Sequence, residues 1–133
     1  MKLTSRSEYA LLALIYLSRN ASDEYVSVET IALAQGIPRK FLEQILLQLK
    51  RGKYVRSLKG QRGGYRLSKP PNSITLAEII RLLDGALAPT QSVSVYFYES
   101  TPLEKDRNLV QVFKEIRDCM AKKLEETTLA DVS

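Results

Sequence analysis

The chain of 133 residues contains no histidine and only one cysteine, Cys119. A single cysteine cannot form an internal disulfide, which fits a reducing compartment. The lack of histidine removes the side chain most often used for proton transfer. Glu43 and Glu78 are candidates for a carboxylate pair, but each has a ready role on a helix surface or in a helix cap. We therefore expect the protein not to be an enzyme.

Long apolar runs are also absent. The apolar run Ala10–Leu17 is far too short to cross a bilayer. Glu8 lies just before it and no small-x-small cleavage site follows it, so it does not resemble a signal peptide. We expect a cytoplasmic protein with no membrane partner. Hydrophobic residues make up 44% of the chain, which is enough for the core of one compact domain.

The positive charge is concentrated in the first half of the chain. The net charge is +5 in total. Residues 1–69 hold thirteen Lys and Arg against five Asp and Glu, a balance of +8, whereas residues 70–133 hold seven against ten, a balance of −3. A basic half suits a polyanionic partner such as DNA, and a solvated surface with a chance asymmetry is the alternative.

The most informative stretch runs from Ile37 to Leu67. It predicts a basic helix that ends at Gly52, followed by two strand-like runs, Tyr54–Leu58 and Tyr65–Leu67. The tip between the runs, Lys59–Gly64, is basic and rich in glycine. It lacks the Lys-Ser/Thr pair of a phosphate-binding P-loop and leads into a strand instead of a helix. A helix followed by a basic hairpin is typical of a winged helix-turn-helix, whose helix enters the major groove of DNA.

Local signals place further helices before this stretch. Ser5–Glu8 has the pattern of a capping box and predicts a helix that ends near Arg19–Asn20. Ser27 is placed to cap a second, short helix, and Gly36 is placed to end it with a left-handed backbone. Pro38 then opens the next helix, which completes a helix-turn-helix. The residues of that helix expected to face inward are Phe41, Leu42, Ile45, Leu46 and Leu49.

The second half of the chain begins with a break at Pro70-Pro71. A second capping box, Thr75–Glu78, predicts a helix that ends at Gly85. Residues 86–102 carry no clear helical signal, and the alternation within Val93–Phe97 predicts a short extended segment.

A long amphipathic helix is predicted to begin within residues 103–106, and Thr127–Val132 is expected to add one short turn. Its apolar stripe consists of Leu109, Val112, Phe113, Ile116, Met120 and Leu124. The stripe exceeds what one small winged domain needs to cover, so we expect it to pair with a second copy; folding back on its own domain is the alternative.

These signals predict a mainly α fold with a small β-hairpin wing. The expected regions are a winged helix-turn-helix DNA-binding domain (1–85), a variable linker or effector segment (86–102) and a dimerisation helix with its tail (103–133).

The chain resembles the Rrf2 family of bacterial transcription regulators. The resemblance covers Lys2 to about Pro89, with a looser match through the long helix. Its most specific pieces are FLEQIL (Phe41–Leu46) and VRSLKGQRGGYRL (Val55–Leu67). It implies a homodimer that binds double-stranded DNA at a roughly palindromic operator.

The resemblance also implies which side chains contact DNA. Those on the recognition helix, for bases or adjacent phosphates, are Arg39, Lys40, Glu43 and Gln44. Those in the wing, for the minor groove or backbone, are Lys59 and Arg62. Those near the start of the first helix, for phosphates, are Arg6 and Tyr9. The chemistry agrees, because Gln pairs with adenine, Glu accepts from cytosine and Arg suits a narrow minor groove.

One departure from the family affects the cofactor. Members that sense through an iron–sulfur cluster carry three closely spaced cysteines before the long helix, whereas Ala86–Lys105 contains neither Cys nor His. Cys119 lies later and is expected to be a small core filler. We therefore expect no cofactor. A regulator controlled by a protein or small-molecule effector, as the family's cysteine-metabolism repressor is by an enzyme, remains an alternative, as does a non-standard sensor with Cys119 shared across a dimer.

Overall fold

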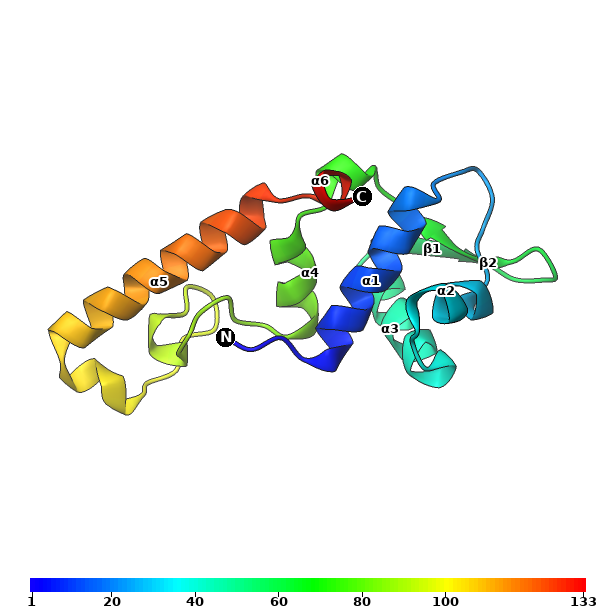
Figure 1. Cartoon of the computed structure of the whole chain (residues 1–133). Coiled ribbons are helices and arrows are strands. Elements are labelled where there is room, and N and C mark those ends of the chain that lie inside the picture. The colour runs from blue at the N-terminus through cyan, green and yellow to red at the C-terminus, as the bar shows by residue number, and fades with distance from the viewer.

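The computed structural model describes residues 1–133 and is mainly helical, with one two-stranded antiparallel sheet (Figure 1). The helices and strands are α1 (Ser5–Arg19), α2 (Val28–Gln35), α3 (Arg39–Arg51), β1 (Val55–Leu58), β2 (Gly64–Leu67), α4 (Leu76–Leu83), α5 (Arg107–Glu126) and α6 (Leu129–Val132). Short 3-10 turns occupy Pro71–Ser73, Gln91–Val93 and Pro102–Lys105. The predicted fold class is confirmed.

The cap of α1 differs from the prediction. Thr4, and not Ser5, is the N-cap, and its hydroxyl accepts a hydrogen bond from the Ser7 amide at 3.2 Å. The capping box predicted for Ser5–Glu8 was therefore wrong, because the helix starts one residue earlier than that pattern requires. Thr4 is itself anchored, since its amide donates to a carboxylate oxygen of Asp84 at 3.1 Å.

The turn between α2 and α3 follows the sequence signals. The Ser27 hydroxyl caps α2 by accepting from the Thr30 amide at 3.1 Å. Gly36 ends the helix with φ +65°, a backbone conformation in which a side chain is strained. Pro38 is the N-cap of α3, where its missing amide hydrogen costs nothing. The predicted helix-turn-helix is thus confirmed.

The core lies where α1, α2 and α3 meet. Its cluster of fifteen buried residues includes Leu14 of α1, Ile31 of α2, and four inward residues of α3, which are Leu42, Ile45, Leu46 and Leu49. Phe41 is only half-buried at the edge of this core. Packing on one face of α3 therefore leaves its opposite face to solvent. We call α1, α2, α3 and the β1–β2 hairpin together the head.

The hairpin follows α3 directly. β1 pairs with β2 in a register that sets Val55 opposite Leu67 and Leu58 opposite Gly64. Val55 is buried in the core, which attaches the hairpin to the helices. Its free end projects away from the helices as a wing (Figure 1).

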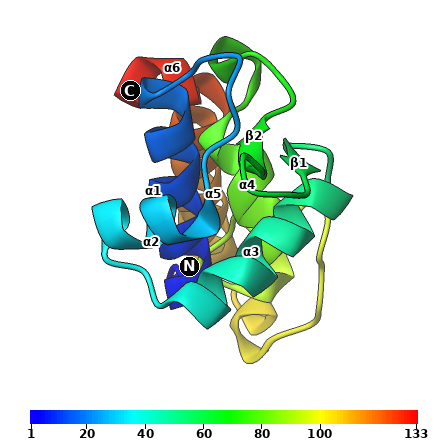
Figure 2. The same cartoon turned by 90° about the vertical axis from the view of Figure 1, so that its right-hand side faces the viewer.

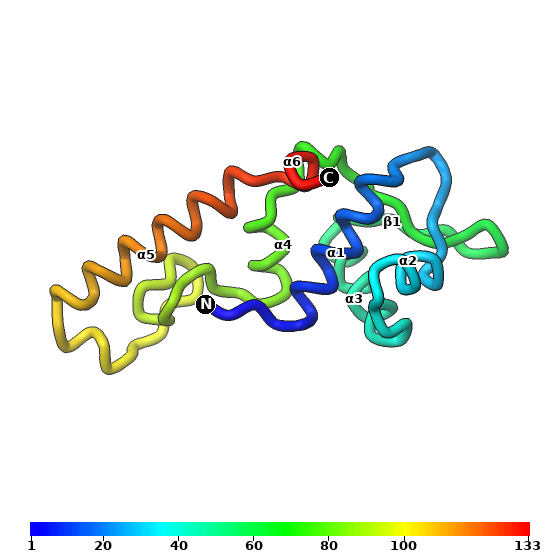
Figure 3. The backbone as a smooth tube through the Cα atoms, viewed as in Figure 1, coloured from blue at the N-terminus to red at the C-terminus, as the bar shows by residue number.

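The C-terminal tail returns to the head. Leu129 of α6 is fully buried in the main core, and its amide donates to the Ile74 carbonyl at 2.9 Å. An Arg19 guanidinium nitrogen donates to the Val132 carbonyl at 3.2 Å, so the chain ends beside the end of α1 (Figure 3). The predicted turn after Thr127 is confirmed as α6. Residues 127–133 thus share a core with the region predicted to be the DNA-binding domain.

Residues 86–102 form no strand, so the extended segment predicted for Val93–Phe97 was wrong. A 3-10 turn buries Val93 and the Ser94 that follows, whereas Val95, Tyr96 and Phe97 are exposed. The alternation fails because no neighbouring strand offers a partner for it.

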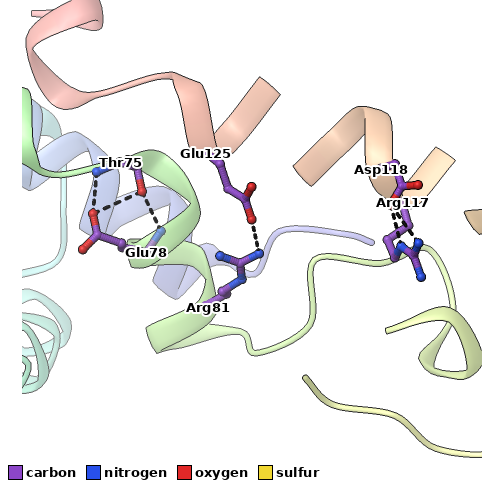
Figure 4. A network of polar contacts seen from close by, with 6 residues as sticks. All are labelled: Thr75, Glu78, Arg81, Arg117, Asp118 and Glu125. Carbon is purple, nitrogen blue, oxygen red and sulfur yellow. Dashed lines mark hydrogen bonds and ion pairs between the residues drawn. The ribbon is translucent and has the colours of Figure 1, made fainter. Parts of the chain in front are cut away.

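The long helix α5 lies on the far side of α4 from α3 and the wing (Figure 1). The Asp106 carboxylate caps it by accepting from the Leu109 amide at 3.0 Å. Arg81 of α4 reaches Glu125 of α5 at 2.5 Å (Figure 4). No residue of α5 is buried. Cys119 is exposed as well, so its predicted role as a core filler within its own chain was wrong.

None of the helices is both long enough and apolar enough to cross a membrane.

Candidate nucleic-acid interface

The outer face of α3 carries the four predicted contact residues of the recognition helix. They lie in its first two turns and all are exposed: Arg39, Lys40, Glu43 and Gln44. The inward residues of the same helix are fixed in the core, so the helix that carries these side chains keeps a constant position on the surface. A rigid helix that presents polar side chains from its N-terminal end is the geometry with which helix-turn-helix proteins read bases.

Arg39 and Glu43 form a pair one helical turn apart. The Nε of Arg39 lies 3.4 Å from the Glu43 carboxylate, and both side chains are at least half exposed. This contact occupies one donor of the guanidinium and leaves its two terminal nitrogens free. Those two nitrogens are the ones that pair with the O6 and N7 acceptors of guanine.

The base of the wing lies next to the recognition helix. Burial raises the pKa of the Tyr65 phenol, and the negative charge of Glu43 raises it further. Tyr65 belongs to β2 and Glu43 to α3, so the base of the hairpin lies within the electrostatic reach of the outer face of the helix.

The wing tip carries the two predicted cations. Lys59 and Arg62 are exposed and form no hydrogen bond or ion pair. The turn that carries them depends on Gly60, whose φ of +113° disfavours a side chain, and on Gly63, whose Cβ would collide with the Leu58 carbonyl. Viewed from the side of the head, α3 and the hairpin both lie at the front of the molecule (Figure 2).

Arg6 and Tyr9 pack on α3 and do not extend freely into solvent. A terminal nitrogen of Arg6 donates to the Gln48 side chain at 3.2 Å, and the guanidinium lies 5.9 Å from the centre of the Phe41 ring. Tyr9 meets the same ring edge to face at 5.5 Å between centroids. The structure thus assigns both side chains a buttressing role on α3, and their phosphate contacts remain a prediction.

Sequence reasoning missed Gln48. Its side chain accepts from Arg6 and donates to the Leu82 carbonyl of α4 at 3.4 Å, so it joins three helices. One signal for it was available, because Gln48 lies between the core positions Ile45, Leu46 and Leu49 on the helix, and a half-buried amide needs partners.

The residues of a single chain do not fit a cysteine-ligated iron site. No group of three His, Cys, Asp or Glu side chains comes close enough to hold a metal ion. Cys119 is the one thiol, and it lies on α5 and not in residues 86–102. One thiol and no imidazole do not fit an iron–sulfur cluster within one chain.

The chain matches the family model described as "Rrf2: Iron-dependent Transcriptional regulator" over residues 3–133. It is 37% identical to a helix-turn-helix-type transcriptional regulator of Mycobacterium tuberculosis strain H37Rv, covering all of this chain and 81% of that protein. It is 29% identical to the transcriptional regulator CymR of Bacillus subtilis, covering all of this chain and 90% of that protein. The relatives are regulators and not enzymes, as expected.

Solved structures agree with this assignment. The structure of CymR, described as the global cysteine regulator of B. subtilis, superposes with a TM-score of 0.78 at 30% identity and covers 99% of this chain and 95% of its own. IscR of T. potens superposes with a TM-score of 0.76 at 27% identity and covers 99% of this chain and 85% of its own. The protein therefore belongs to the Rrf2 family and is a DNA-binding transcriptional regulator with a winged-helix fold.

Proposed function

We propose that two copies of this chain form a symmetric dimer that binds a near-palindromic DNA operator in the bacterial cytoplasm. Each copy places α3 in a major groove and the wing tip on the adjacent backbone or minor groove. The observation that carries this proposal is the exposed N-terminal face of α3 on the same side of the molecule (Figure 2) as the hairpin, whose tip carries two unpaired cations.

The side chains divide into those that read bases and those that bind phosphates. Arg39 reads guanine while Glu43 holds its Nε, and Gln44 pairs with adenine through its amide. Lys40, Lys59 and Arg62 neutralise phosphates or enter the minor groove. Arg6 and Tyr9 contribute by holding α3 in place, through the contacts with Gln48 and Phe41 described above.

The dimer forms through the apolar stripe of α5. Leu109, Val112 and Ile116 are 48%, 49% and 40% exposed within one chain, although they recur at helical spacing. Such a stripe on a 20-residue helix is a surface that a second copy covers. A symmetric pair then presents two heads to two half-sites.

The regulatory signal enters through residues 86–102 from a protein or small-molecule effector. Tyr96 and Tyr98 are exposed there, as expected for a partner surface. Control through a protein partner, and not through a cysteine-ligated cluster, fits a segment without thiols.

Selection of binding sites from a random pool of duplexes, followed by affinity measurements at several salt concentrations, tests the proposal. We expect one enriched site with two related half-sites. Log affinity should fall linearly with log salt, because phosphate contacts release counterions. A pool without enrichment, or binding insensitive to salt, would contradict the proposal.

Substitutions separate base reading from phosphate binding. Gln44→Ala should relax preference at one base of each half-site by about 1–3 kcal/mol. Arg62→Ala should weaken binding to all sequences and reduce the salt slope by about one for each wing. Arg107→Ala is the matched control, because this exposed arginine lies at the start of α5 and should leave both quantities unchanged.

A further inference from the structure

The linker between α1 and α2 runs along the hairpin and pairs with it. Val26 and Tyr65 exchange two backbone hydrogen bonds, each of 2.8 Å. Figure 2 shows this linker descending past β2 to the start of α2. The wing is therefore the end of a two-stranded ribbon whose base is held by a third segment from the linker. An isolated two-stranded hairpin is marginally stable, so this third segment bears on how firmly the wing is held.

Arg66 makes further contacts between the hairpin and the linker. Its Nη1 donates to the Asp23 carbonyl at 3.1 Å, and its Nη2 lies 3.9 Å from the Asp23 carboxylate. The guanidinium lies 5.8 Å from the centre of the Tyr25 ring. The side chain of Arg66 is only 31% exposed, which matches a group engaged with its own chain.

Arg56 provides an internal comparison. It lies directly opposite Arg66 in the β1–β2 ladder, so both side chains lie on the same face of the hairpin. Arg56 is exposed and forms no hydrogen bond or ion pair. Of two arginines with the same charge on the same face, only Arg66 forms a hydrogen bond and an ion pair with the linker.

Gly64 allows the linker to approach this closely. A Cβ at position 64 would overlap the Val26 carbonyl oxygen, and the φ of Gly64 is +147°. A backbone packed onto a glycine leaves no room for the hairpin to shift toward the linker. The linker and the base of the wing are thus fitted to each other at Gly64 and joined by Arg66.

We propose that Arg66 is a wing-positioning residue, which clamps the α1–α2 linker onto the hairpin and so fixes the direction in which Lys59 and Arg62 point. This inference depends on the proposed function, because it requires that the wing tip contacts DNA. The clamp also links the wing to α2, since Ser27 at the end of the linker is the N-cap of that helix. Wing and helix-turn-helix are thereby held as one rigid surface.

The rival role for Arg66 is a direct contact with a DNA phosphate. The two roles differ in how Arg66 depends on the wing tip. A positioning residue acts through Lys59 and Arg62, so its removal matters little once they are gone. A phosphate contact is independent of them, so its effect is the same with or without them.

A double-mutant cycle distinguishes the roles, measured as affinity for the duplex that the wild-type protein selects from a random pool. The four proteins are the wild type, Arg66→Ala, the tip variant Lys59→Ala/Arg62→Ala, and the combination of all three substitutions. We expect Arg66→Ala to weaken binding about tenfold in the wild-type background and less than about twofold in the tip variant. Arg66→Ala should also lower the slope of log affinity against log salt in the wild-type background, but not in the tip variant.

Arg66→Lys adds a second readout. It keeps the positive charge but lacks the planar guanidinium that reaches the Asp23 carbonyl and lies over the Tyr25 ring. Under the positioning role, Arg66→Lys resembles Arg66→Ala, and the backbone amides of Val26 and Tyr65 exchange hydrogen faster in both variants. Under a phosphate role, Arg66→Lys retains most of the affinity.

The outcomes are separable. Equal losses from Arg66→Ala in both backgrounds, or unchanged amide exchange at Val26 and Tyr65, would overturn the positioning role while leaving the proposed function intact. A tip variant that binds as tightly as the wild type would overturn both proposals. Arg56→Ala is the matched control and should change neither affinity nor exchange, and a melting temperature for each variant verifies that the fold persists.

Discussion

The head and the long helix α5 bury their apolar residues in different ways. Most of the fifteen residues of the main core come from the helices of the head, and they leave one polar face of α3 open. The 20 residues of α5 contain none that is buried, although the helix carries an apolar stripe. Figure 3 shows how α5 lies apart from the head, with the chain returning to the head after it.

This difference shows which surface is complete in one chain and which is not. The recognition face is held by packing from behind, so a single copy presents it. At the C-terminal end of the stripe, Leu124 packs against the small core of α4. Leu109, Val112 and Ile116 stay exposed in one chain, and a continuous apolar surface of this kind marks a site of protein association. Single-residue changes in the two regions should therefore have different consequences, and four predictions test this.

The largest effect is expected on α5. Ile116→Glu places a charge in the middle of the stripe and should convert the proposed dimer to a monomer, because burying an unpaired carboxylate is costly. Operator affinity should then fall at least about a hundredfold, since two linked heads bind far more tightly than one. Sedimentation equilibrium and fluorescence anisotropy measure the two quantities.

Gln111→Glu is the control for this change. It adds the same charge to the same helix, at an exposed position on the side away from the stripe. The comparison between the two regions breaks down if Ile116→Glu remains dimeric, or if both variants dissociate equally.

The second prediction concerns the tail that follows α5. Leu129→Ala should lower the free energy of unfolding by about 2–5 kcal/mol, because it opens a cavity in the core of the head. Leu33→Ala, at a side chain that is 80% exposed, should change it by less than about 0.5 kcal/mol. Urea denaturation gives both values, and similar small losses would show that the tail is not part of the head's core.

Local sequence signals predicted the parts of the fold that short-range interactions determine. Gly36, the capping box Thr75–Glu78 and the inward face of α3 were all predicted correctly. Each depends on residues within about one helical turn, so pattern alone suffices. The prediction of the α1 cap was wrong because Thr4 and Ser5 are neighbouring hydroxyl residues and either can start a helix.

Long-range packing explains what sequence reasoning missed. The burial of Leu129 depends on a chain reversal after α5 that no local pattern announces. The contacts of Arg6 with Gln48 and of Arg66 with Asp23 join residues about forty positions apart. A cationic residue in the basic half of the chain is readily taken for a DNA contact. Only the fold shows which of these side chains bind groups of their own chain instead.

The third prediction sharpens the view that the head is well packed. The hydroxyl of Ser7 is fully buried and has no hydrogen-bond partner, an exception within this core. Ser7→Ala should therefore raise the free energy of unfolding by about 1 kcal/mol. Ser5→Ala, at an exposed position in the same turn, is the control, and a loss of stability in Ser7→Ala would show that the hydroxyl has a partner.

The smallest effect is expected from pH. Burial raises the pKa of Tyr54, and the charge and hydrogen bond of Glu78 add to it. Because the folded pKa lies above the unfolded value of 10.0, this stability is fully present below pH 10 and is lost as pH rises through the folded pKa. Tyr54→Phe should lessen the fall in unfolding free energy above pH 10; an unchanged slope would contradict this.

Hydroxyl-radical footprinting of the protein on its selected operator tests the central claim most directly. If two heads are presented by paired α5 helices, the protected sugars form two symmetric groups about one helical turn, or about 10 base pairs, apart or a multiple of it. Ile116→Glu should then remove the protection at matched concentration. A single protected group without symmetry, or a footprint that Ile116→Glu leaves unchanged, would contradict the account.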